Sequence, residues 1–98
     1  MNFEFCIYKI HMTKIWAKII KEQRITFSKI VVIDDVYHSS KLFDFVVQVC
    51  YELDIPTPAV LYSHKYNFTN FNIAKFKQDD FVEEIDFDML QIEYVVEK

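Results

Sequence analysis

The strongest constraint on the fold is an apolar repeat between residues 40 and 54. Apolar side chains recur there every three or four residues, at Leu42, Phe45, Val46, Val49 and Leu53. That spacing places them on one face of an α-helix. The stripe is widened by Phe43, Val47 and Cys50, and the polar side consists of Lys41, Asp44, Gln48, Glu52 and Asp54. The pattern predicts an amphipathic helix at about 40–54 that packs on a second layer.

The ends of this helix also have sequence signals. A hydroxyl of Ser39 or Ser40 is expected to cap the first turn, because it can accept a hydrogen bond from an unpaired backbone N–H. Pro56 is expected to end the helix, because the residue before a proline avoids the α conformation.

The remaining segments indicate mainly strands. Residues 3–12, 25–33 and 86–96 have alternating or β-rich patterns. Residues 14–21 fit either a strand or a two-turn helix, and a strand is favoured because Lys21 to Arg24 suits a turn into the next strand. Residues 59–62 suggest a short strand or an extended segment, residues 63–77 irregular structure or a short strand, and residues 78–84 one helical turn.

We therefore expect residues 1–98 to form a single compact α+β domain. Its small antiparallel sheet combines an N-terminal meander with a C-terminal strand, and the helix at about 40–54 packs on one face. Residues 1–33 carry six basic and two acidic residues, whereas residues 78–98 carry one basic and eight acidic residues. Opposite charge favours pairing of these two regions as neighbouring strands.

The chain contains no glycine, which excludes several classes of site. A phosphate-binding P-loop, a dinucleotide-binding turn, an EF-hand loop and the nucleophile elbow of a hydrolase all need glycine where the backbone turns sharply. Turns are instead expected to use Asn, Asp, Ser, Lys or Pro, with few residues at positive φ.

Side chains that bind metals or perform catalysis are scattered. His11, His38 and His64 are far apart in the sequence, so a metal site would need convergence in three dimensions, for example of His38 with Asp34 and Asp35. An enzymatic site would need a deep pocket in which two or more of His38, His64, Asp34 and Asp35 converge. A dyad of Cys50 with a histidine is disfavoured because Cys50 lies on the helix face expected to be buried. We therefore predict no catalytic residues, no metal site, no cofactor and no enzymatic activity.

Cys6 and Cys50 are both embedded in apolar runs, which favours buried, reduced thiols over a disulfide. No secretory leader and no apolar run of membrane-spanning length is visible. The expected location is cytoplasmic, without membrane attachment. Lysine outnumbers arginine ten to one, which we interpret as the codon bias of an AT-rich genome.

Two segments suggest binding surfaces. Residues 62–77 combine five aromatic residues with three lysines and no acids, a composition that can stack on and neutralise a single-stranded nucleic acid. Packing of the core is the alternative role. The possible interaction residues of this segment are Tyr62, His64, Lys65, Tyr66, Phe68, Lys75 and Lys77.

The second segment, residues 79–97, is acidic. Carboxylates along a surface can imitate a phosphate backbone, and they also serve simply to keep a surface solvated. The possible acidic surface consists of Asp79, Asp80, Glu83, Glu84, Asp86 and Asp88.

By elimination, the sequence favours a small non-enzymatic interaction or regulatory module. It would use a sheet surface or an exposed edge strand against a protein partner or a second copy of itself. The alternative is a nucleic-acid-related protein, which binds single strands through residues 62–77 or mimics nucleic acid through residues 79–97.

Overall fold

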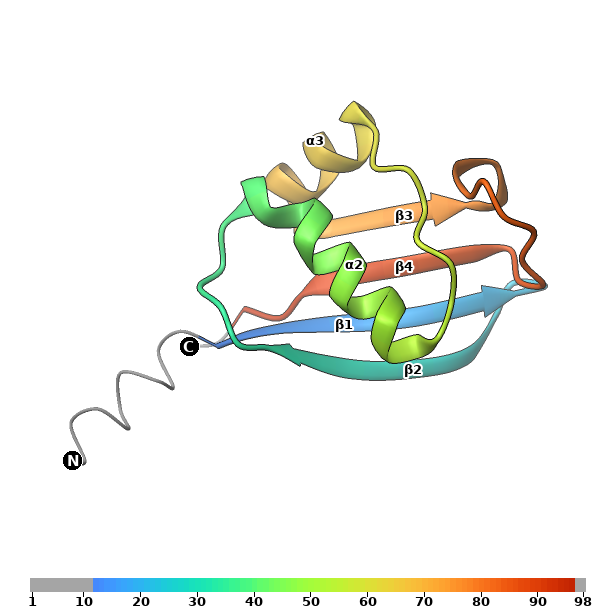
Figure 1. Ribbon diagram of the computed structural model, residues 1–98, viewed down its shortest axis with the longest axis horizontal. Coiled ribbons are helices and arrows are strands. Elements are labelled where there is room, and N and C mark those ends of the chain that lie inside the picture. Colours follow the sequence, from blue (N-terminus) through green and yellow to red (C-terminus); the bar gives the residue numbers. More distant parts are fainter. Residues whose placement is uncertain (1–11, 97–98) are drawn as a thin grey trace.

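The computed structural model describes residues 12–96, and within them four strands form one antiparallel sheet (Figure 1). The strands are β1 (Thr13–Lys21), β2 (Arg24–Ile33), β3 (Ile73–Lys77) and β4 (Met89–Tyr94), in the order β2-β1-β4-β3. Two helices, α2 (Leu42–Leu53) and α3 (Tyr62–Phe71), pack on the sheet. The predicted α+β class is confirmed. The strand expected at 3–12 lies outside the described residues, except for Met12.

The start of the described chain is a β-hairpin, as predicted. β1 and β2 pair antiparallel from Thr13↔Ile33 to Lys21↔Arg24, so residues 14–21 are a strand. The turn consists of Glu22 and Gln23, whose φ angles are 54° and 66°. This left-handed conformation usually belongs to Gly, Asn or Asp in a two-residue hairpin turn. The turn therefore lies where the sequence predicts it, between Lys21 and Arg24, but Glu22 and Gln23 are not among the residue types that we expected at turns.

Helix α2 follows the predicted periodicity. Its buried residues are Leu42, Phe45, Val46, Val49 and Cys50. Phe43 and Val47, which we expected to widen the buried stripe, are instead 54% and 38% exposed. The buried stripe is therefore narrower than predicted, because no other element within residues 12–96 covers that flank of the helix.

The prediction of a serine cap is wrong. Ser39 and Ser40 lie inside a short 3-10 turn, η1 (Ser39–Lys41), that precedes α2. Its cap is His38, whose Nδ1 accepts the Ser40 N–H at 3.1 Å. The far end behaves as expected: α2 ends at Leu53, and Asp54 adopts the left-handed conformation that closes a helix before Pro56.

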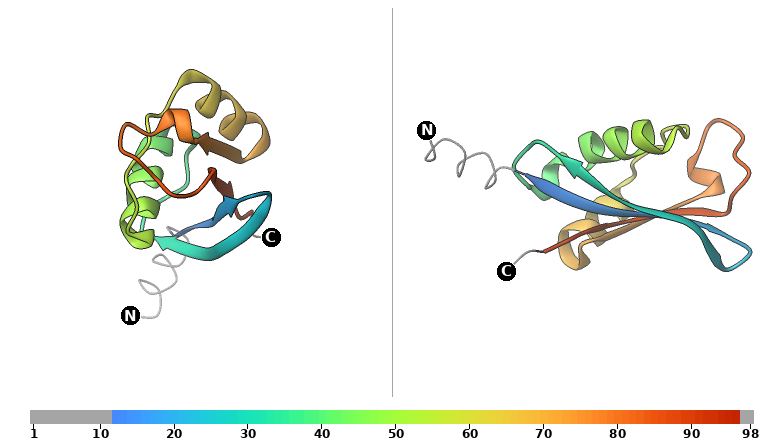
Figure 2. Two further views of the ribbon diagram at one scale, coloured as in Figure 1. Left: turned by 90° about the vertical axis from the view of Figure 1, so that its right-hand side faces the viewer. Right: turned by 90° about the horizontal axis from the view of Figure 1, so that it is seen from below.

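The core lies between one face of the sheet and the two helices. Side chains alternate across a strand, so Ile15, Ala17, Leu90 and Ile92 point to the helices and are fully buried. Figure 2 shows the twisted sheet on one side and the two helices on the other. We call the sheet surface that faces away from the helices the open face.

Helix α3 was not predicted. Residues 63–77 were expected to be irregular or a short strand, but Tyr62–Phe71 is helical and only Ile73–Lys77 is a strand. Residues 59–61 form no strand, but Leu61 has an extended backbone, as the alternative for this segment predicted, and Tyr62 begins α3. The helix has only two buried residues, His64 and Phe68, one turn apart. Two buried residues are too few to give a periodic apolar pattern in the sequence.

The last part of the described chain agrees with prediction. The helical turn expected within residues 78–84 is the 3-10 turn η2 (Gln78–Asp80), and the final strand is β4. β4 lies directly beside β1, so the basic and acidic regions of the chain are neighbours. The register of this pairing does not place opposite charges directly across from each other at Lys18, because Lys18 lies opposite the uncharged Gln91. Among residues 12–96, no helix has the length and apolar character needed to cross a bilayer.

Candidate functional site

The most exposed strand of the described sheet is the edge strand β2. It pairs with β1 on one side, and the sheet order leaves its other side at the edge. Four large apolar side chains of β2 are exposed: Ile25, Phe27, Ile30 and Val32, at 57%, 48%, 45% and 52%. Because α2 covers only the end of this strand, where Val31 and Ile33 are buried, the rest of β2 has no cover among the described residues. We call the outer side of Arg24–Ile33 the β2 edge.

The opposite edge of the same sheet is built differently. β3 has five residues against ten in β2, and its exposed side chains include Lys75 and Lys77 but no large apolar residue. Short length and lysine are the usual devices that stop an edge strand from pairing with another chain. β3 therefore has the features of a protected edge. β2 is twice as long, and its protective features are one lysine and a register shift against β1 between Ile19 and Ile20.

The one lysine in β2 does not protect its edge. Lys29 lies on the helix side of the sheet, and its Nζ is 3.0 Å from Oε1 of Glu52 on α2. Both side chains are nearly half exposed, so the pair contributes little to stability. Its effect is to direct the charge of Lys29 towards the helix.

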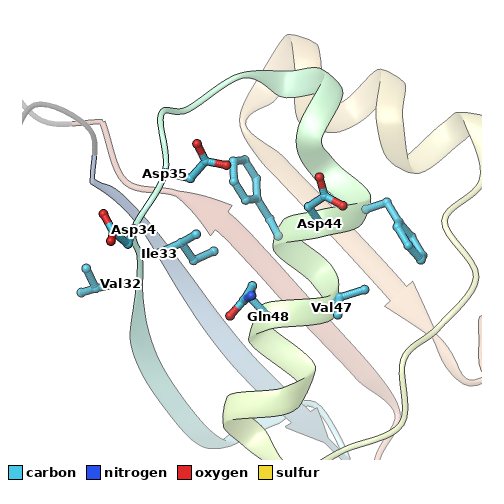
Figure 3. A pocket seen from close by; sticks show the side chains of 9 residues that line it. Val32, Ile33, Asp34, Asp35, Asp44, Val47 and Gln48 are labelled. Carbon is cyan, nitrogen blue, oxygen red and sulfur yellow. The ribbon is translucent and has the colours of Figure 1, made fainter.

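A hollow of about 640 Å³ lies between the end of β2 and α2. Figure 3 shows Val32, Ile33 and Asp34 on the strand side, and Asp44, Val47 and Gln48 on the helix. Asp35 lies above them and binds Lys41 at 2.9 Å. Asp34 and Asp44 make no hydrogen bond with any described residue, so this end of the β2 edge has an acidic character.

The catalytic constellation considered from the sequence is not assembled. The hollow includes Asp34 and Asp35 but neither His38 nor His64 in its lining. His38 binds Ser40 instead, with its Nδ1 2.7 Å from the hydroxyl oxygen. Within the described chain, no three potential metal-binding side chains gather.

His64 has a structural role. Its Nδ1 accepts the backbone N–H of Leu61 at 2.9 Å, so the proton is on Nε2, which donates to Asp80 at 3.1 Å. The ring is buried and lies 4.2 Å from that of Phe76, centroid to centroid. The pair joins the start of α3 to η2.

Cys50 is buried in α2. Burial raises the pKa of its thiol to about 11, and a hydrogen bond with Thr57 opposes this only in part. A thiol with such a pKa is protonated near neutral pH and is a poor nucleophile. Cys6 lies outside the described residues.

The possible interaction residues of segment 62–77 do not form one surface. His64 and Phe68 are buried, whereas Tyr62, Lys65 and Tyr66 are exposed on α3. Lys75 and Lys77 lie on β3, where they alternate with the buried Ala74 and Phe76 and so point to the open face. The residues of this segment are therefore divided between the core, the exposed side of α3 and the open face.

The acidic segment is only partly available. Asp80 accepts hydrogen bonds from His64 and from the Lys77 backbone, and Asp88 accepts one from the Glu22 backbone at 2.7 Å. The side chains of Asp79, Glu83, Glu84 and Asp86 are exposed. They lie on η2 and a loop, whose irregular course does not give the regular spacing of a phosphate backbone.

The open face centres on Trp16 of β1, which is 37% exposed. The Nζ of Lys18 lies 3.8 Å from the centroid of the indole ring. This cation–π contact covers a ring that would otherwise be available for stacking.

Comparison with protein-family models, with curated proteins and with solved structures gives no match in any of the three. The function is therefore argued from the geometry of the surface. The sequence predicted that a sheet surface or an exposed edge strand would bind a partner, but it did not identify which strand lies at the edge. The clustered apolar residues at 25–33 were the available signal.

Proposed function

We propose that this protein is a non-enzymatic interaction module that binds a protein partner by accepting an extended strand along the β2 edge. The observation that carries the proposal is a ten-residue edge strand with four exposed apolar side chains. An added strand gains backbone hydrogen bonds along the edge and covers apolar side chains on both faces.

The two faces of the edge supply different contacts. Phe27 lies on the helix side, and Ile30 and Val32 lie on the open face, as their pairing with β1 shows. Alternate side chains of a bound strand would therefore find an apolar neighbour on either face, and the acidic hollow would lie beside one end.

The test is a double substitution, Ile30→Lys with Val32→Lys. Both side chains are about half exposed, so the fold should tolerate the change, while two lysines should block the edge for an incoming strand. Val82→Lys is the matched control, because Val82 is 94% exposed in the loop before β4. Tagged protein is used to capture partners from the native host, and amide hydrogen exchange of β2 is measured with the captured partner.

We expect the wild-type protein and the Val82→Lys variant to capture the same partner and the double variant to lose it. The backbone amides of β2 should exchange more slowly in the complex. A partner that the double variant retains, with unchanged exchange in β2, would show that binding uses another surface.

A second candidate function depends on Tyr62 and Tyr66. Both rings are exposed on α3, their centroids are 6.4 Å apart, and Lys65 lies between them in sequence. Exposed aromatic rings next to a lysine can stack on unpaired bases. Retention on a single-stranded nucleic-acid column that falls with salt, and that is lost in Tyr62→Ala with Tyr66→Ala, would support this alternative.

A further inference from the structure

We propose that the strand bound at the β2 edge is β2 of a second copy of this chain, running antiparallel. This inference rests on the proposed function, because it assumes that the edge accepts a strand. A twofold axis perpendicular to the sheet would join the two sheets into one continuous sheet, with all helices on the same side.

The charges at the two ends of β2 are self-complementary. Arg24 is the first residue of the strand, and Asp34 follows its last residue. Both are exposed, and the carboxylate of Asp34 makes no hydrogen bond with a described residue. Antiparallel pairing places the start of one strand beside the end of the other, so each Arg24 would meet Asp34 of the second copy.

This charge pairing also defines a register. Lys29 is midway between Arg24 and Asp34 and would lie at the twofold axis. The register of β2 against β1 shifts by one residue between Phe27 and Ile25, so regular pairing with the second copy would run from Phe27 to Val31, and Arg24 would approach Asp34 beyond its end. Phe27 then lies opposite Val31 of the second copy on the helix side, and Ser28 lies opposite its Ile30 on the open face. Each Lys29 already has Glu52 at 3.0 Å, which offsets the repulsion between the two lysines at the axis.

The same strand length limits the strength of the dimer. Ten residues of strand span about 33 Å, and a strip of that length about 10 Å deep is smaller than the roughly 800 Å² per partner of a standard interface. We therefore expect an equilibrium that shifts to monomers on dilution, with a dissociation constant on the micromolar scale.

A charge swap tests this arrangement. Within one chain, Arg24 and Asp34 are separated by the length of β2, about 33 Å, which is several Debye lengths at physiological ionic strength. Any energetic coupling between them must therefore arise between two copies. Sedimentation equilibrium of the full chain is measured for the wild type, Arg24→Asp, Asp34→Arg and the double swap.

We expect each single variant to dimerise about tenfold more weakly or worse, because the symmetric dimer contains each contact twice. The double swap should restore the dimer to within about threefold of the wild type, with a smaller difference at high salt. Arg24→Asp combined with Asp86→Arg is the control. It has the same net charge as the double swap, but Asp86 lies in the loop before β4, so it should not restore the dimer. Circular dichroism verifies that every variant is folded.

The outcomes separate this inference from the proposed function. A wild-type protein that stays monomeric at all concentrations, but still captures a foreign partner through β2, overturns the second-copy inference alone. A dimer that survives the Ile30→Lys, Val32→Lys change and both single charge variants also overturns it, because such a dimer uses another surface. A monomer that captures nothing through β2 overturns both.

Discussion

Two phenylalanines on α3 offer a matched test of which aromatic side chains in segment 62–77 stabilise the fold. Phe68 is fully buried against the core, and Phe71, one turn later, is 65% exposed. Replacing each by alanine makes the same chemical change in the same helix. The difference between the two variants therefore reports burial.

The expected magnitudes follow from these exposures. Phe68→Ala removes a whole aromatic ring from a packed core and should lower the free energy of unfolding by about 3–5 kcal/mol. Only about a third of the surface of Phe71 is covered, so removing its ring should cost about 0.5–1 kcal/mol of burial free energy. The better helix propensity of alanine returns up to about 0.5 kcal/mol, so Phe71→Ala should change the free energy of unfolding by less than about 1 kcal/mol.

Urea denaturation measures both values, with the fluorescence of Trp16, the only tryptophan, as the signal. The slope against urea concentration should stay constant, so that the midpoint reports stability. A domain of this size is stable by about 5–15 kcal/mol, and Phe68→Leu, which leaves a smaller cavity, serves as the variant if Phe68→Ala does not fold. Equal losses at the two positions would refute the assignment of Phe68 to the core.

Two further predictions concern the turn and the buried thiol. Gln23→Gly should raise the free energy of unfolding by about 0.5–1 kcal/mol, because glycine has no steric penalty at a φ of 66°. The thermal midpoint should rise accordingly, and an unchanged or lower midpoint would contradict this prediction. The unfolded chain ionises Cys50 near its ordinary pKa of 9.0, whereas the folded chain does so only near 11. The contribution of this thiol to stability should therefore be constant below pH 9 and fall by about 2 kcal/mol between pH 9 and 11. Burial also raises the pKa of Tyr37, which adds to the loss of stability at high pH, so Cys50→Ala should reduce the fall without abolishing it in parallel urea titrations.

The elements that the sequence predicts well are those that bury many residues with one period. α2 has five buried residues on one face. β1 alternates buried Thr13, Ile15 and Ala17 with more exposed neighbours, but its residues 14–21 also fitted a two-turn helix, and the turn that follows them was what favoured a strand. α3 was missed because its contacts with the core are local, through His64 and Phe68 alone, and its exposed face contains aromatic residues that are not typical of a solvated helix. Tertiary contacts therefore determine its conformation more than its own pattern does.

The candidate site was less predictable for a similar reason. A strand becomes an edge only through the order in which the sheet assembles, and that order depends on long-range pairing such as β1 with β4. The possible interaction residues at 62–77 are contiguous in sequence, but a helix and a strand point their side chains in different directions. Tyr66 and Lys75 consequently belong to different surfaces, and no sequence window could show that.

The hydrogen bonds around β2 add a physical reason for assigning function to its edge. The hairpin turn is fixed where the Glu22 N–H donates to Asp88 at 2.7 Å, and the middle of the strand is tied to α2 by Lys29 and Glu52 at 3.0 Å. Beyond the strand, the buried Thr13 hydroxyl donates to the Asp35 carbonyl at 2.7 Å. An edge held by hydrogen bonds at its start and just beyond its end loses little further freedom when a second strand binds, so more of the interaction energy appears as affinity. β2 therefore combines exposed apolar side chains with a backbone that is already ordered for pairing.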